Sequence, residues 1–241
     1  MTTTIKLTLA NAEVNRLFTR KLANQMGFYE ALMQKINALI RRCQLNQAYS
    51  LLALLDIQDA IHGLTTQYFD EIDKFEGLLE KKKHLKGMAF DYSTRFEPKV
   101  AFDSSLAADL VELFAVYDRL ISILKLLRFA GCFSRDDDYF ANLRRTYKSV
   151  NRLLSQIQLT KIQELPAVTL MDVIDNTESY QLIANLNGEI DYNALYRAMT
   201  SNLAPRIAEK LRQPLLYRLK KKIKALQVSK ANEAQVISQC A

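Results

Sequence analysis

The chain has 241 residues, of which 49% are hydrophobic and 24% charged, so it can bury a sizeable core and has an ordinary globular composition. Only 6 glycines, 4 prolines and no tryptophan argue against an all-β fold, and long stretches without a helix breaker predict a mainly α protein. The net charge of +7 and the pI near 9.2 favour a polyanionic partner, which can be a nucleic acid, an acidic membrane or an acidic protein.

Cysteine usage and hydropathy indicate the compartment. The three cysteines are far apart and odd in number, so they fit neither a disulfide framework nor a CxxC metal pattern. The N-terminus lacks the apolar segment of a signal peptide, and the most apolar stretch, residues 106–130, carries six charged side chains. We therefore expect a cytoplasmic protein without a membrane span.

Polar and apolar side chains alternate over the first nine residues, which predicts a short β-strand with one buried face. Its polar face would carry Thr4, Lys6 and Thr8. Because such a strand is not stable alone, it must pair with another strand and pack on helices. A strand directly before a helix in a basic chain is typical of ribbon-helix-helix DNA-binding proteins, in which these three side chains would contact bases. The alternative is an edge strand that only closes a core.

Helical periodicity follows the strand at once. Asn11 is the predicted N-cap of the first helix, and further helices are expected over about 29–43 and from about 46 to 80. The alternation returns at residues 95–102, where Arg95 and Lys99 lie on the polar face and form a second choice of base-contacting residues. Pro98 cannot donate a ladder hydrogen bond, so this strand is short or at an edge. The two strands can pair within one chain or each can pair across a dimer.

Two more helices have clear start signals. Ser104 and its neighbours are expected to cap a helix over about 106–130 that Gly131 ends. Residues 134–137 resemble a capping box and predict a helix to about 158. Beyond Pro166 the pattern is weak until a helix that begins at Asp191. We therefore predict a ribbon-helix-helix-like DNA-binding core over 1–160, a helical C-terminal extension over 161–228 and a disordered tail over 229–241.

Two clusters of basic residues are candidates for phosphate contacts. The first forms a positive stripe on the helix before residue 158, where Arg144, Lys148 and Arg152 lie at i, i+4 and i+8 with Arg145 beside them. The second lies in residues 201–230, which carry nine lysines or arginines and one glutamate, and it comprises Arg218, Lys220, Lys221 and Lys222. Either cluster can instead be a solvated helix face, and a basic amphipathic helix can also bind acidic lipid.

Catalytic patterns are missing from the sequence. The two histidines, His62 in a helix and His84 in a lysine run, have no nucleophile or metal-ligand motif around them. The run of aspartates at 136–138 is explained by the helix macrodipole at a helix start. We therefore expect a protein that is not an enzyme and that needs no cofactor and no metal.

The order of motifs resembles a known family. The motifs are the strand I-K-L-T-L, the helix segment N-R-L-F-T-R-K, residues 49–52 (Y-S-L-L), the strand F-E-P-K-V-A-F, residues 116–120 (V-Y-D-R-L) and the turn at 131–135 (G-C-F-S-R). Over about residues 4–157 the chain resembles the AcaB-like regulators carried by integrative and conjugative elements and conjugative plasmids. The resemblance implies a bacterial transcription regulator of conjugative transfer with a ribbon-helix-helix-like DNA-binding part.

The preferred interpretation is a helical bundle with a small antiparallel β-ribbon that binds double-stranded DNA. The ribbon would enter the major groove while lysines and arginines contact phosphates, and we expect a homodimer because palindromic recognition is the common solution. The alternative is a helical adaptor that binds an acidic partner or a membrane surface through its basic C-terminus.

Overall fold

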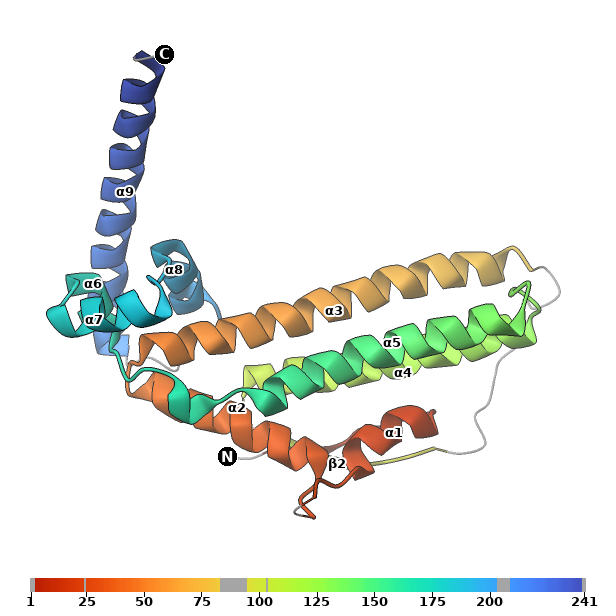
Figure 1. Cartoon of the computed structure of the whole chain (residues 1–241). Coiled ribbons are helices and arrows are strands. Elements are labelled where there is room, and N and C mark those ends of the chain that lie inside the picture. Colours follow the sequence, from red (N-terminus) through yellow and green to blue (C-terminus); the bar gives the residue numbers. More distant parts are fainter. Residues whose placement is uncertain (1–2, 24, 83–94, 103, 203–208, 240–241) are drawn as a thin grey trace. The chain divides into compact units, whose positions relative to one another are not determined.

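The computed structural model describes residues 3–23, 25–82, 95–102, 104–202 and 209–239, and this part of the chain is mainly helical, as the sequence predicts (Figure 1). The elements in chain order are β1 (Thr3–Lys6), α1 (Ala12–Thr19), α2 (Phe28–Gln44), α3 (Ala48–Glu80), β2 (Lys99–Phe102), α4 (Ser105–Phe129), α5 (Asp136–Leu159), the 3-10 helix η2 (Ile162–Glu164), α6 (Leu170–Asp175), α7 (Glu178–Asn187), α8 (Tyr192–Thr200) and α9 (Glu209–Gln239). Among the described residues, no helix combines the length and the apolar content that crossing a bilayer requires.

The chain divides into two compact units. The first unit comprises Met1–Ile36 and Ile57–Thr160, and the second comprises Asn37–Asp56 and Lys161–Ala241. The predicted core over 1–160 therefore differs from the first unit by the segment 37–56. This segment joins the second unit because the Ala48 N–H donates to the Val168 carbonyl at 2.9 Å and the Leu170 N–H donates to the Asn46 carbonyl at 2.8 Å.

The two strands pair within the chain. β1 and β2 form a two-stranded antiparallel sheet in which Lys6 lies opposite Lys99 and Thr4 lies opposite Ala101. The same register continues to an isolated bridge between Leu9 and Phe96. Both strands are shorter than their alternating patterns, because Pro98 accepts a hydrogen bond from the Leu7 N–H at 3.1 Å but has no N–H to return.

Three helices form the core of the first unit. α3, α4 and α5 run side by side, and most of the inward face of α4 is fully buried (Figure 1). The Tyr68 ring stacks on Tyr117 with centroids 5.8 Å apart, and the Tyr68 hydroxyl donates to the Thr146 carbonyl at 2.7 Å. Burial raises the pKa of both tyrosine hydroxyls, so they stay protonated and serve packing and hydrogen bonding.

Helix ends follow the sequence signals in part. Ser104 caps α4 by accepting a hydrogen bond from the Ala107 N–H, and Gly131 follows its end with a φ of 62°. The capping box predicted at 134–137 is wrong, because Arg135 is the N-cap of α5 without a side-chain cap bond. A capping box does form at the start of α6, where the side chains and backbones of Thr169 and Asp172 bond reciprocally.

The second unit is built around α9. α9 contacts α6 and α8, and its inward positions Leu215 and Leu219 are buried. The weakly patterned region beyond Pro166 forms α6 and α7, each with a threonine N-cap. The predicted disordered tail from 229 is not what the structure has, since α9 continues to Gln239. Residues 215–239 contain no glycine or proline and are rich in good helix formers, so nothing stops the helix earlier.

Candidate nucleic-acid interface

The β-ribbon presents one polar face. Cross-strand partners in an antiparallel pair point to the same side, so Thr4, Lys6, Thr8 and Lys99 share a face, and all four are exposed. The opposite face packs inward, where Leu9 and Val100 are fully buried. The structure therefore brings Thr4, Lys6 and Thr8, the residues predicted to contact bases, together with Lys99. We call the surface formed by these four residues the ribbon face.

A carboxylate also belongs to the ribbon face. Glu97 lies opposite Thr8 in the continued register, and its Oε2 lies 3.4 Å from the Lys6 Nζ. Both side chains are more than half exposed, so this ion pair is weak and exchangeable. Arg95, the other second-choice residue, is exposed just before the ribbon. The ribbon face thus offers hydroxyl, ammonium and carboxylate groups, which are the groups that bind base edges.

The positive stripe predicted on α5 is only partly available. Arg145 donates two hydrogen bonds of 2.8 Å to the Glu71 carboxylate on α3, so it ties two helices of the first unit together. Arg144 and Lys148 are exposed and have no ion pair among the described residues. Arg152, one turn further along the same stripe, is also exposed, so Arg144, Lys148 and Arg152 form the part of the stripe that can meet a phosphate.

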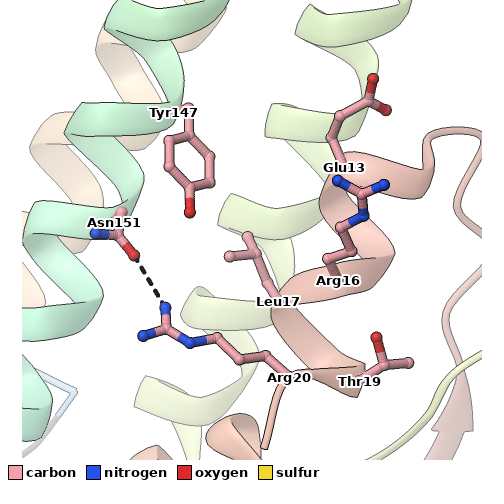
Figure 2. Close-up of a pocket in the computed structure, with 7 residues that line it drawn as sticks. All are labelled: Glu13, Arg16, Leu17, Thr19, Arg20, Tyr147 and Asn151. Carbon is pink, nitrogen blue, oxygen red and sulfur yellow. Dashed lines mark hydrogen bonds between the residues drawn. The ribbon is translucent and has the colours of Figure 1, made fainter.

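A cleft lies between α1 and α5 in the first unit. It has a volume of about 640 Å³, and its lining residues are Glu13, Arg16, Leu17, Thr19, Arg20, Tyr147 and Asn151. Figure 2 shows the α5 side chains on one wall and the α1 side chains on the other. The Arg20 Nη1 donates to the Asn151 Oδ1 at 3.3 Å, and its guanidinium lies over the Phe28 ring.

A buried polar network joins the ribbon to this cleft. The Asp118 carboxylate, on α4, accepts the backbone N–H of Ala10 at 2.9 Å and that of Asn11 at 3.0 Å. The Asn11 side chain donates to Asp118 and Ser122 instead of capping α1 itself, which corrects the predicted side-chain cap. The carboxylate of Asp118 therefore fixes the point where the chain leaves the ribbon and enters α1.

The network ends at Glu13 on the rim of the cleft. The Lys125 Nζ donates to the Asn11 Oδ1 at 2.8 Å and to the Glu13 Oε2 at 3.0 Å. Partial burial alone would raise the pKa of Glu13, but a backbone hydrogen bond, Lys125 and Arg16 together hold that pKa below its usual value. Glu13 is therefore ionised at neutral pH, and Lys125 and Arg16 compensate its charge.

The basic cluster of α9 belongs to the second unit and is largely engaged. Arg218 forms an ion pair with Asp175. The Lys220 Nζ lies 5.5 Å from the centroid of the Tyr196 ring, and the Lys222 Nζ lies 5.6 Å from that of Tyr192. Lys221 is exposed and has no ion pair among the described residues.

None of the seven residues that line the cleft is among the site residues predicted from the sequence; four of the seven carry a guanidinium, aromatic or amide group, namely Arg16, Arg20, Tyr147 and Asn151. Arg16 and Arg20 lie one turn apart on the polar side of the first helix, directly after the ribbon, and this spacing was the available signal. Their approach to α5 depends on packing that no local pattern encodes. Among the described residues, no three or more histidine, cysteine, aspartate or glutamate side chains lie together as potential metal ligands. Asp136 instead binds Arg128 at 3.0 Å.

Comparisons with known proteins identify one family. The family model of the transcriptional regulator AcaB matches residues 1–208 of the chain. No curated protein gives a significant sequence match. Among solved structures, the chain is similar to a crystal structure of selenomethionine-containing AcaB from uropathogenic E. coli, with 12% identity and a TM-score of 0.48, over 84% of this chain and 98% of that one.

Proposed function

The chain belongs to the AcaB family of transcriptional regulators, as its motifs predict, and we propose that it binds duplex DNA through the ribbon face. In this proposal the ribbon enters the major groove in the manner of ribbon-helix-helix proteins, while Arg144 and Lys148 contact phosphates. The regulated genes would be those of a conjugative mobile element.

The observation that supports the proposal is the composition of the ribbon face. A lysine can donate to the acceptors of guanine, and a threonine can bond to a base edge or contact the thymine methyl group. Lys6 and Lys99 are directly opposite each other, so their ammonium groups would reach neighbouring bases. The buried face of the ribbon holds it on the helices, so the polar side chains are presented by a supported element.

The test is the double variant Lys6→Ala/Lys99→Ala. A preferred duplex is first selected from a random library with the full chain, and affinity for it is then measured by fluorescence anisotropy. Removing one hydrogen-bonded base partner should cost about 1–3 kcal/mol on the preferred duplex and much less on an unrelated one. Folding should be unchanged, because both side chains are exposed.

Two variants serve as controls. Lys74→Ala removes an exposed lysine of α3 in the same unit and should leave the preference for the selected duplex intact. Glu97→Gln removes the carboxylate of the ribbon face and should strengthen binding to an unrelated duplex, where no base contact is lost, since like charge repels phosphate. Wild-type discrimination in the double variant would contradict the proposal.

We also propose that two copies act together on a palindromic site. Because β1 and β2 pair within one chain, each copy carries its own complete ribbon, and a dimer would carry two. Light scattering of the free protein and binding stoichiometry on a duplex with two half-sites test this. Two chains per duplex are expected, with half-sites spaced by about one helical turn or a multiple of it. A single chain bound per duplex would contradict the dimer.

A further inference from the structure

We propose that the cleft between α1 and α5 binds a small phosphorylated molecule with a planar ring, which is the chemistry of a mononucleotide. The proposal does not depend on DNA binding by the ribbon face. It rests on the charge of the cleft, on the aromatic and apolar groups between its charged side chains, and on its volume.

The charge of the cleft favours a phosphate. Arg16, on α1, and Arg20, the residue directly after α1, are both exposed and both line the cleft (Figure 2). A guanidinium group donates hydrogen bonds in a planar fork that matches the oxygens of a phosphate. The one carboxylate in the lining, Glu13, accepts a hydrogen bond from Lys125 at 3.0 Å and also faces the charge of Arg16, so one negative group stands against two arginines and a lysine. Arg144 and Lys148 are two more exposed basic residues of α5, the helix that contributes Tyr147 and Asn151 to the cleft.

The walls favour a planar ring beside that phosphate. Tyr147 is 45% exposed and presents its ring from α5, while the buried Leu17 forms an apolar part of the opposite wall. Stacking on an aromatic side chain is a common way to hold a base. Asn151 supplies an amide whose Nδ2 can donate to a ring substituent while its Oδ1 holds Arg20.

The shape favours a small molecule over the backbone of a duplex. A concave space of about 640 Å³ falls within the range of small-molecule sites in proteins. The ligand would contact five residues from the segment 13–20, which directly continues from the ribbon through the amides held by Asp118. Binding there would thus involve the helix that directly follows the ribbon strand β1 in the chain.

The experiment is isothermal titration calorimetry of the full chain with AMP, GMP, CMP and UMP. Adenosine and inorganic phosphate serve as fragments and should bind more weakly than at least one mononucleotide. Arg16→Ala should weaken that binding by about tenfold or more, because a hydrogen-bonded charge pair is removed. Asn151→Asp should do the same, since it places a negative charge in the cleft. Arg135→Ala, an exposed arginine outside the cleft, should change nothing.

Asn151→Asp keeps the test independent of folding. The new carboxylate would pair with Arg20, so the variant should be at least as stable as the wild type while it repels an anion. Absence of mononucleotide binding by the wild type would overturn the proposal, as would binding that survives both cleft variants. If mononucleotides do not bind and both variants weaken all duplexes alike, the cleft holds DNA backbone instead, and the small-ligand proposal is likewise overturned.

Discussion

The ribbon face and the basic segment of α9 use positive charge in different ways. The α9 segment has the denser charge, with four basic residues between positions 218 and 222. Within it, Arg218 is paired with Asp175, and two lysines lie over tyrosine rings of α8. The ribbon face has only Lys6 and Lys99, but these stand beside threonine hydroxyls on a supported strand pair.

The difference shows that charge density does not identify the surface that can recognise a sequence. A lysine over a tyrosine keeps its charge, so α9 can still attract phosphate without regard to sequence. Recognition of bases needs donors and acceptors held in a defined register, and the ribbon supplies these. We therefore expect discrimination to depend on the first unit and any contribution of α9 to be general.

The largest effect is expected from Asp118→Ala. It leaves the amides of Ala10 and Asn11 without their buried acceptor and should lower the free energy of unfolding by about 3 kcal/mol. Urea denaturation followed by circular dichroism measures this. The control Asp137→Ala removes an exposed carboxylate and should change stability by less than about 0.5 kcal/mol. Equal stability of the two variants would mean that the ribbon does not depend on the network.

An intermediate effect is expected from the triple variant of Lys220, Lys221 and Lys222 to alanine. A plot of log K against the logarithm of the salt concentration falls with increasing salt. For every phosphate that is no longer neutralised, its steepness should decrease by roughly 0.9. All duplexes should weaken alike, so the preference for the selected duplex should persist. Anisotropy titrations at several salt concentrations measure both quantities. If the slope stays unchanged while binding to acidic vesicles or acidic proteins disappears, α9 serves the adaptor function instead.

The smallest effect is expected from Glu13→Gln. The pKa of Glu13 is lowered in the folded chain, so its ionised form stabilises the fold above its unfolded pKa near 4.5, and this contribution is lost as the pH falls through the folded pKa. Because Glu13 and Lys125 are each more than a third exposed, we expect less than about 1 kcal/mol at pH 7. The unfolding free energies of the wild type and the variant should differ at pH 7, and this difference should shrink as the pH is lowered below about 4.5 and through the folded pKa of Glu13. Glu112→Gln, at an exposed position of α4, provides the matched control.

Local patterns in the sequence account for most of the helices and for the two strands. Helical periodicity and the scarcity of glycine and proline placed α2, α3, α4 and α5 within a few residues, since both signals act locally. The alternation of polar and apolar residues correctly predicted which side chains lie on the polar face of each strand. The order of the motifs correctly predicted the AcaB family. The predicted disordered tail from 229 is part of α9 as far as Gln239, because a position near the chain end does not stop a helix that holds no glycine or proline over residues 215–239.

Long-range packing in the folded chain sets which partners these elements have. The pattern allowed β1 to pair within the chain or across a dimer, and the ladder with β2 follows from the packing of Leu9 and Val100 on the helices. Asp118 looks like one more charge on an apolar helix until the fold brings it to the amides before α1. Likewise Arg20 and Asn151 are 131 residues apart, so their contact, and with it the cleft, depends on tertiary packing that no sequence window contains.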